Sequence, residues 1–308
     1  MDFLVSMLDV GMQVGILFIM IAVGFTAAKF GLINKKGAAQ ITDILFYIVT
    51  PAVIINAFYG VQFTKQRLLS LLIVALGAVF VHFIGITLSR LIYRDKAKSA
   101  YMKLGTVFSN CGFMSLPLAA ALFQETGVFL VSIYIIVHTI FMWTYGIGLC
   151  EKEKLSLSRA LINPGTIGVI IGLPLFILGI NLPDIISIPL ASFSSLNTPL
   201  AMIVIGFYLS GTRLGIMEGD KKVLLVSLMR LIAVPAITLI IFAFLPFHRD
   251  VLHIIMLPVC APTAASIAML AAKFTGDATS SSRMVSLTTV LSIITIPIFM
   301  ALSKMIFE

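Results

Sequence analysis

Charge is scarce in this chain. Only 11% of its 308 residues are Asp, Glu, Lys or Arg, whereas 60% are hydrophobic and the mean hydropathy is +1.12. Soluble globular domains carry about 25% charged residues, so this composition excludes a soluble fold. The connections between apolar stretches run to about a dozen residues, which is too short for an additional domain. Any function must therefore lie within the membrane-embedded part.

Acidic residues are absent from the predicted centres of the apolar stretches. The acids nearest to these stretches, all expected at segment ends or in loops, are Asp43, Glu125, Asp184, Asp250 and Asp277. This distribution argues against the intramembrane carboxylate pair of a sodium/proton antiporter. The sequence also predicts no Lys or Arg deep within a membrane span. Arg230 is expected near the cytoplasmic end of its segment, where its long side chain can reach the interface.

Sequence motifs for catalysis are lacking as well. No HExxH sequence, no paired DDxxD-like cluster and no Walker motif occurs, which leaves an intramembrane protease, a prenyl transferase and an ATP-driven pump without machinery. The three cysteines, Cys111, Cys150 and Cys260, form no disulfide framework. We therefore predict that the protein is not an enzyme and holds no cofactor or metal.

The chain is rich in apolar segments long enough to cross a bilayer, which takes about 20 residues. Ten such segments lie near residues 11–29, 38–58, 68–92, 101–123, 127–149, 163–180, 186–211, 222–245, 251–273 and 284–306. The first residues include Asp2 and Asp9 but no Lys or Arg, unlike a secretory signal peptide, so the first segment is expected to be retained. The predicted fold class is an all-α membrane protein with ten transmembrane helices.

Basic residues are distributed unevenly between the two sets of connections. If the N-terminus lies outside, 17 of the 21 Lys and Arg residues fall on the cytoplasmic side and 4 on the other. Cytoplasmic loops of membrane proteins carry such an excess. The pattern predicts a multi-pass protein of the cell inner membrane with both termini on the non-cytoplasmic side. It also accounts for the net charge of +8 without a nucleic-acid partner.

The two halves of the chain resemble each other in order. The Thr-Pro pair at 50 recurs at 198, AAALF ending at 123 resembles LAAKF ending at 274, and VSIYIIVHTI from 131 resembles VSLTTVLSII from 285. Three ordered matches with similar offsets indicate a duplication. Five segments per repeat is an odd number, so the second copy enters the membrane from the opposite side. We predict a first five-helix repeat over residues 1–150 and an inverted second repeat over 151–308.

Two of the apolar segments contain helix-breaking residues near their middle. The fourth, LGTVFSNCGFMSLPLAAALF, includes Pro117, and the ninth, VLHIIMLPVCAPTAASIAMLAAKF, includes Pro258 and Pro262. Unpaired backbone groups are costly in lipid, so broken helices survive only where protein or a water-lined cavity receives them. Corresponding breaks in two inverted repeats point to a transporter binding site at their crossover. There, helix N-termini favour an anion, and freed carbonyls favour a cation.

Small and polar residues at these breaks are the candidate ligands of a substrate. In the fourth segment they are Asn110, Ser109 and Gly112, of which Asn110 can both donate and accept hydrogen bonds. In the ninth segment the nearest polar candidates are Thr263 and Ser266. The alternative is that these residues only pack helices and satisfy freed backbone groups.

Further polar residues lie within other predicted spans. Thr50 precedes Pro51, and Asn197 precedes Thr198 and Pro199, so each Thr-Pro pair predicts a kink whose lost hydrogen bond the Thr can replace. Thr50 and Asn197 are candidate ligands. Asn197 and Asn56 could equally form hydrogen bonds between helices.

Two histidines also lie in predicted spans. His138 and His82 are in the fifth and third segments. Histidine can shuttle protons near neutral pH, but without a visible carboxylate partner each is interpreted first as a hydrogen-bonded structural residue.

The breaks FSNCGFMSLPL and LPVCAPTAASIAML, together with the closing SLTTVLSIITIPI, resemble the auxin efflux carrier family over essentially the whole chain. The resemblance implies a scaffold of segments one, two, six and seven and a moving transport domain of the others, with crossover helices four and nine carrying the site. It also implies a possible homodimer through the scaffold, and small organic anions such as auxin, malate or malonate as substrates. Only CEKEKLSLSR joins the two halves, so the long regulatory loop of many plant carriers is absent.

These observations together predict a secondary active transporter that moves a small organic anion across the cytoplasmic membrane by alternating access. The main alternative is a sodium-coupled organic anion symporter of the bile-acid transporter type, although the acidic sodium ligands of those proteins have no evident counterpart here. A ligand-binding receptor would need a signalling domain, and a membrane enzyme would need a convergent acid, base or metal set. The sequence offers neither.

Overall fold

The structure is a computed structural model that describes residues 3–93, 99–150, 163–211, 220–267 and 278–307. Throughout these residues the chain is helical, with one isolated antiparallel bridge and no strand. The helices of the first half are α1 (Phe3–Lys29), α2 (Lys35–Ile44), α3 (Thr50–Tyr59), α4 (Lys65–Ile92), α5 (Ala100–Val107), α6 (Leu116–Phe141) and α7 (Ile147–Cys150). Those of the second half are α9 (Pro164–Leu178), α10 (Asp184–Ser195), α11 (Asn197–Ser210), α12 (Lys221–Leu228), α13 (Val234–Ala243), α14 (Arg249–Cys260) and α16 (Ala278–Phe307).

Short π-helical segments join several of these helices. They are η1 (Leu45–Val49), η2 (Cys111–Ser115), η3 (Met142–Gly146) and η5 (Met229–Ala233). Such wide turns often occur at functional sites. In η1 the wide turn is followed by Pro51, and the Thr50 hydroxyl donates to the carbonyl of Leu45 at 2.8 Å. The threonine therefore supplies a donor beside the proline, as the Thr-Pro pattern predicts.

Polar residues in the loops set several helix starts. The side chains of Asn34, Thr64, Asn163 and Asp220 accept hydrogen bonds from backbone N–H groups of the first turns of α2, α4, α9 and α12. Such caps satisfy N–H groups that have no partner inside the helix. The other end of α9 stops at Gly179, whose φ of 60° lies in the left-handed region that glycine tolerates.

Seven helical stretches in the described part of the chain are long and apolar enough to cross a membrane. They are Phe3–Lys29, Lys35–Tyr59, Lys65–Ile92, Cys111–Leu149, Asp184–Ser210, Lys221–Ala243 and Ser280–Phe307. The apolar helix Pro164–Leu178 is shorter, and α14 ends at Cys260 where the ninth predicted segment breaks. The chain is thus an all-helical, multi-pass membrane protein, and the number of ten crossings stays a prediction.

The longest of these stretches is folded back on itself. Gln124 has φ 53° and ψ −142°, which is incompatible with a continuous helix. A Cβ added to Gly127 would lie 2.6 Å from the carbonyl oxygen of Ala119, although the two residues are far apart in a straight helix. The chain therefore reverses at Gln124, between the predicted fourth and fifth segments.

Glycines allow α1 to approach α11 closely. A Cβ at Gly24 would collide with the backbone of Ile203, and one at Gly206 with the carbonyl of Ile21. Small residues at such an interface let two membrane helices pack backbone against backbone. Helix α1 also packs along α16, and α3 packs against α9 and α10.

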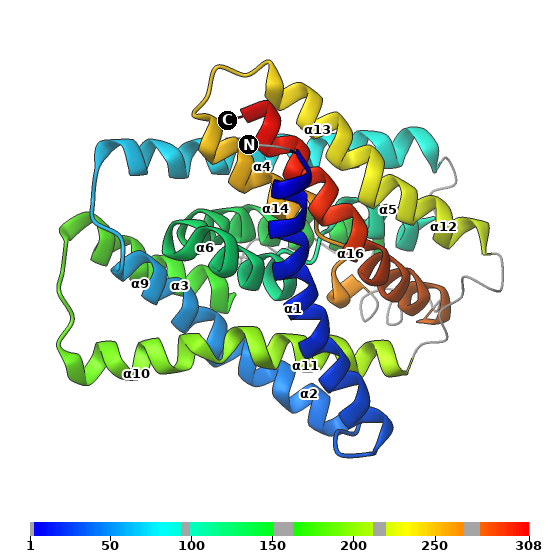
Figure 1. Ribbon diagram of the computed structural model, residues 1–308, viewed down its shortest axis with the longest axis horizontal. Helices are drawn as coiled ribbons and strands as arrows, with labels where there is room; N and C mark the ends of the chain where they lie inside the picture. Colours follow the sequence, from blue (N-terminus) through cyan, green and yellow to red (C-terminus); the bar gives the residue numbers. More distant parts are fainter. Residues whose placement is uncertain (1–2, 94–98, 151–162, 212–219, 268–277, 308) are drawn as a thin grey trace.

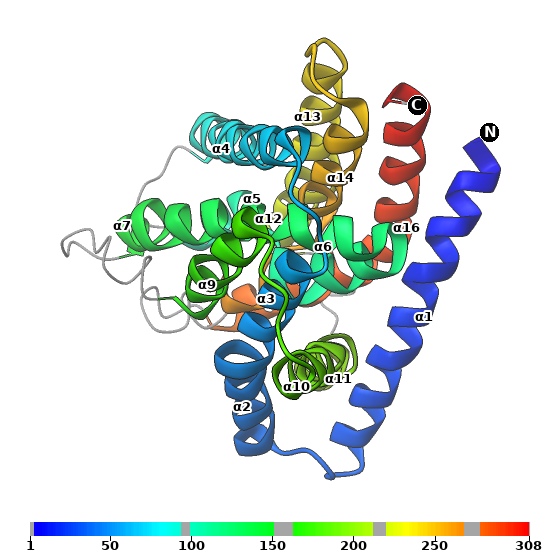
Figure 2. The same ribbon diagram turned by 90° about the vertical axis from the view of Figure 1, so that its left-hand side faces the viewer.

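Figures 1 and 2 show how these contacts divide the molecule. Helices α10 and α11 follow each other along one side, α4 lies on the opposite side, and α5, α6 and the end of α14 lie between them. In both views the described ends of α1 and α16 lie side by side. The interrupted helices are consequently in the interior.

Candidate functional site

The two breaks meet inside the protein. Ser109 and Thr263 form the isolated antiparallel bridge, the N–H of Asn110 donates to the carbonyl of Pro262 at 2.7 Å, and the N–H of Ala264 donates to that of Phe108 at 3.0 Å. We call residues 108–111 and 261–264 the crossover. This pairing confirms the prediction that the fourth and ninth segments face each other at their breaks.

At the end of α5 the break leaves carbonyls without their usual helical donors, because Asn110 directs its N–H to Pro262 instead. The hydroxyl of Thr263 donates to the carbonyl of Gly105 at 2.8 Å. The guanidinium of Arg230 donates to the carbonyls of Thr106 and Val107 at 3.2 and 3.5 Å. Buried backbone carbonyls need hydrogen-bond donors. Here side chains from the second half of the chain donate to carbonyls of the first half.

The same guanidinium satisfies the end of α14. Pro262 has no N–H to offer the carbonyl of Pro258, and Arg230 donates to that oxygen at 3.4 Å, to Ala261 at 3.0 Å through Nε, and to Val259. The five donors of Arg therefore hold two helix C-termini at once. Each C-terminus carries a partial negative charge equivalent to about half an electron, so two of them balance one guanidinium.

This position of Arg230 corrects the sequence prediction. Arg230 was expected to reach the membrane interface, but its side chain is only 1% exposed and its partners in the described chain are backbone carbonyls. The signal was present: Arg230 is nine residues beyond Lys221, the first residue of α12, which corresponds to about 13 Å of helix. The sequence suggested the freed carbonyls as ligands of a cation. In the structure they accept hydrogen bonds from the guanidinium of Arg230 instead.

A cavity of about 640 Å³ lies on the other side of the crossover. Its lining includes residues of both breaks, Ser109, Asn110 and Ala264, and residues of the helical turns that follow them, Cys111, Gly112, Phe113, Ala265 and Ser266. Thr50, Asn163 and Tyr208 also line it. The start of a helix presents unpaired N–H groups and a partial positive charge, which suits an anion.

Three candidate residues of the fourth segment line this cavity and have unused hydrogen-bonding groups or open space beside them. Asn110 caps η2 by accepting from the N–H of Phe113 at 3.3 Å, and its side-chain NH₂ has no partner among the described residues. The Oγ of Ser109 is buried and also lacks a partner there. A Cβ added at Gly112 would meet no atom within 4 Å. Unsatisfied buried polar groups are rare and often mark a ligand or water site.

The other predicted ligands are not all in this cavity. Ser266 lines it and lies 3.9 Å from the sulfur of Met142, and Thr50 lines it while binding its own backbone. Thr263 is not among its lining residues: it is fully buried, its hydroxyl bonds Gly105, and its N–H donates to Thr288 at 3.2 Å. The geometry makes Thr263 a structural residue of the crossover.

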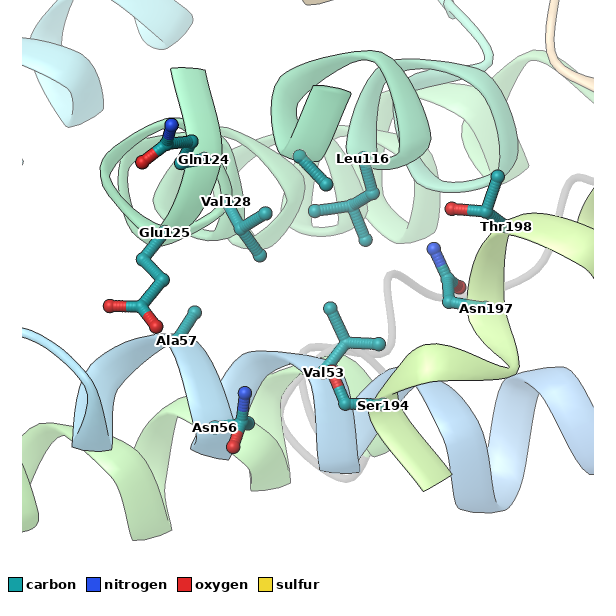
Figure 3. Close-up of a pocket in the computed structure, with 11 residues that line it drawn as sticks. Val53, Asn56, Ala57, Leu116, Gln124, Glu125, Val128, Ser194, Asn197 and Thr198 are labelled. Carbon is teal, nitrogen blue, oxygen red and sulfur yellow. The ribbon is translucent and has the colours of Figure 1, made fainter. Parts of the chain in front are cut away.

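Asn197 lines a second, smaller pocket of about 250 Å³. Figure 3 shows this pocket between α3, which carries Val53 and Asn56, the turn of α6 at Glu125, and the start of α11 at Asn197. The Oδ1 of Asn197 is buried without a partner in the described chain. Glu125 is exposed, as the prediction of a segment end requires.

The five prolines expected at kinks occupy different positions. Pro51 and Pro117 lie at the first turns of α3 and α6, where a missing N–H is tolerated. Pro199 is in the first turn of α11, just after the interruption at Leu196. Pro258 lies inside α14, and Pro262 lies in the crossover itself.

Comparison with known proteins gives two similarities. The sequence profile of the family described as "Membrane transport protein" matches residues 9–158 and 153–300. An uncharacterized transporter of Methanocaldococcus jannaschii is 25% identical over 236 residues, which cover 72% of this chain and 75% of the relative.

Proposed function

Since this chain belongs to the membrane transport protein family, the auxin efflux carrier family that its motifs resemble, we propose that it is a secondary carrier for a small organic anion such as a mono- or dicarboxylate. The observation that carries the proposal is the 640 Å³ cavity, which both breaks line with the first residues of new helical turns. Anions bind helix starts, and Asn110 and Ser109 add neutral donors beside them.

The proposed architecture is two inverted five-helix repeats, residues 1–150 and 151–308, that cross the membrane ten times. Three observations support it. The antiparallel pairing of the breaks relates α5 to α14, and the turn at Gln124 separates two predicted crossings inside one long helical stretch. Both described ends of the chain lie together, as an even number of crossings requires.

Within this architecture we assign α1, α2, α3, α9, α10 and α11 to a scaffold and the remaining helices to a transport domain. The close packing of α1 on α11 and of α3 on α9 supports the first group. The contacts of α6 with α4 and α14, and of α5 with α12, support the second. The cavity and the smaller pocket both lie between the two groups.

Alternating access is supported by the placement of these two spaces. The large cavity reaches Thr42 and Asp43 at one end of the second segment, whereas the small pocket is lined by Val53 and Asn56 further along it. The same order holds along α11, from Tyr208 to Asn197. The structure thus fits a carrier open at one end and narrowed at the other. By the basic-residue rule, the open end faces the cytoplasm of the inner membrane and both termini face away.

The arrangement of Arg230 favours a carrier that does not require sodium at its crossover. The carbonyls that could coordinate a sodium ion already accept hydrogen bonds from this guanidinium. A homodimer through the scaffold remains a prediction.

The test is a thermal-unfolding screen of the purified full chain with malate, malonate and indole-3-acetate, each with and without sodium. A ligand at 100 times its dissociation constant stabilises the folded state by about 2.7 kcal/mol. We expect one of these acids to stabilise the protein without sodium and to be taken up by proteoliposomes. Failure of all three to bind or move would overturn the proposal.

Asn110→Asp sharpens this test, because Asp is as good a helix cap as Asn but adds a negative charge beside the ligand. We expect the variant to fold normally and to lose anion binding about tenfold or more, a cost of about 1.4 kcal/mol or more. Asn56→Asp, which makes the same change in the small pocket, is the matched control and should bind the acid as the wild type does.

A further inference from the structure

Two histidines from different segments form a pair at the wall of the large cavity. The Nε2 of His82 on α4 lies 3.3 Å from the Nδ1 of His138 on α6. His138 lines the cavity and is 5% exposed, and His82 lies buried behind it. The two histidines are 56 residues apart in the sequence, where neither has a visible carboxylate partner.

The hydrogen bonds fix which nitrogens carry protons when both rings are neutral. The Nδ1 of His82 lies 2.7 Å from the carbonyl oxygen of Ala78, and a carbonyl can only accept, so this nitrogen holds the proton. The Nε2 of His82 then has a lone pair and accepts from the Nδ1–H of His138. The Nε2 of His138 is left as a lone pair, and it has no hydrogen-bond partner among the described residues.

Aromatic packing holds the two rings in this arrangement. The ring of His82 stacks on Phe141, with centroids 4.7 Å apart at 19°, and Phe108 of the crossover meets His138 edge-on at 5.3 Å. One proton can therefore be added at His138 Nε2 while every other hydrogen bond stays in place. The result is an imidazolium in the wall of the cavity that contains Asn110.

The charges around the pair make protonation of His138 depend on whether an anion is bound in the cavity. Tyr134 packs on His82. Burial of both rings is the main factor that opposes a positive charge on them, and the charge of Arg230 adds to it. Among the described residues, the other ionisable groups of the cavity wall are Asp43, Tyr47, Cys111 and Tyr208. A second positive charge near Arg230 is costly in an empty cavity, whereas a bound carboxylate would compensate it.

We propose that His138 Nε2 is the proton-binding site of the carrier and that a proton and the organic anion are carried together. This inference rests on the proposed anion transport. The proton comes from water on the side to which the cavity is open, travels as the N–H of His138, and returns to water on the other side. His82 is a positioning residue that fixes the tautomer of His138.

The experiment uses the full chain in proteoliposomes that contain a trapped pH indicator, with malonate, malate and indole-3-acetate added separately outside. Protein-free liposomes correct for passive entry of each acid. We expect wild-type uptake to acidify the lumen and to accelerate when the outside is made more acidic. Uptake of an acid by the wild type without lumen acidification would overturn this inference and leave anion transport standing. No uptake of any of the three acids would remove anion transport and this inference together.

Two variants locate the proton. His138→Asn keeps an N–H donor near the position of Nδ1 but removes Nε2, and it should still bind the acid while lumen acidification falls about tenfold or more. His253→Asn is the matched control, because His253 is a buried histidine outside both pockets that binds Ser303 at 2.6 Å. It should acidify the lumen like the wild type. Acidification by His138→Asn at the wild-type level would exclude His138, and the wild-type measurement holds even if a variant does not fold.

Discussion

Single residues at the crossover divide two tasks between them. Arg230 and Thr263 donate hydrogen bonds to backbone carbonyls that the breaks leave without helical donors, and neither residue lines the large cavity. Asn110, Ser109 and Gly112 face the cavity and retain free donors or free space. The backbone of the crossover is therefore satisfied from one side, which leaves the other side for a ligand.

Gly112 offers a test of the cavity that does not disturb the fold. We expect Gly112→Leu to leave thermal stability unchanged or higher, because leucine is the better helix former by up to about 1 kcal/mol and meets no atom at Cβ. Its side chain would occupy space used by the anion, so affinity should fall about tenfold or more. Ligand-induced shifts in unfolding temperature measure this change.

Gly148→Leu is the control for this substitution, since a Cβ at Gly148 also meets no atom and Gly148 lies outside both pockets. Equal loss of binding in the two variants would show that the effect of Gly112→Leu is not local.

At the scale of helices, the structure depends on contacts between elements that lie far apart in the sequence. Arg230 of η5 joins the ends of α5 and α14, and glycines join α1 to α11. The first contact holds the proposed transport domain around its crossover. The second holds the proposed scaffold together.

Arg230→Ala should destabilise the protein strongly. It leaves buried carbonyls at both helix ends without donors, and each such group costs about 1–3 kcal/mol. Arg230→Lys keeps the charge but has three donors instead of five, so it should fall between alanine and the wild type. Thermal unfolding in detergent measures the difference.

Arg90→Ala is the matched control, because Arg90 is exposed and its guanidinium lies over the ring of Tyr145 at 5.5 Å. It should cost about 1 kcal/mol or less. If Arg230→Ala cost no more than Arg90→Ala, the guanidinium would not hold the crossover.

Gly206→Ala should separate α1 from α11. The added methyl group would overlap the carbonyl of Ile21, so one backbone must move, which typically costs about 1–3 kcal/mol or more. Gly11→Ala on α1, where a Cβ meets no atom, should leave stability unchanged or raise it by up to about 1 kcal/mol. Unfolding midpoints of the two purified variants make the comparison, and equal midpoints would contradict the close approach.

For the whole molecule, the two spaces at opposite ends of the same interface are the feature that matters for transport. The narrow end is formed where α3, a helix of the proposed scaffold, meets the turn of α6. If the carrier alternates, these two parts must separate during each cycle.

A disulfide across the narrow end tests this movement. A Cβ at Gly60 would lie 2.7 Å from Oε2 of Glu125, so Gly60→Cys combined with Glu125→Cys places two thiols within reach of each other. We expect oxidation to stop uptake into proteoliposomes and reductant to restore it, while each single variant is unaffected by oxidant. Transport at the normal rate by the cross-linked protein would show that this contact does not open.

Much of the fold could be predicted because it depends on local composition. Long apolar segments, the breaks at Asn110 and Pro262 and the threonine beside Pro51 follow from residues that are neighbours in the chain. The burial of the Arg230 side chain could not be predicted in this way. Its stability inside the protein depends on carbonyls supplied by α5, which is more than 120 residues away.

The sequence by itself therefore determined that the chain is an all-helical membrane protein with paired broken helices, because hydropathy and helix-breaking residues act locally. Only the tertiary structure decided which candidates share a cavity: Asn110, Ser109, Gly112, Ser266 and Thr50 line one, Asn197 another, and Thr263 neither. It also brought His82 to His138 and Arg230 to the crossover. The physical reason is that hydrogen bonds and enclosed space require atoms within a few ångströms of each other, and that proximity arises only when helices from both halves pack.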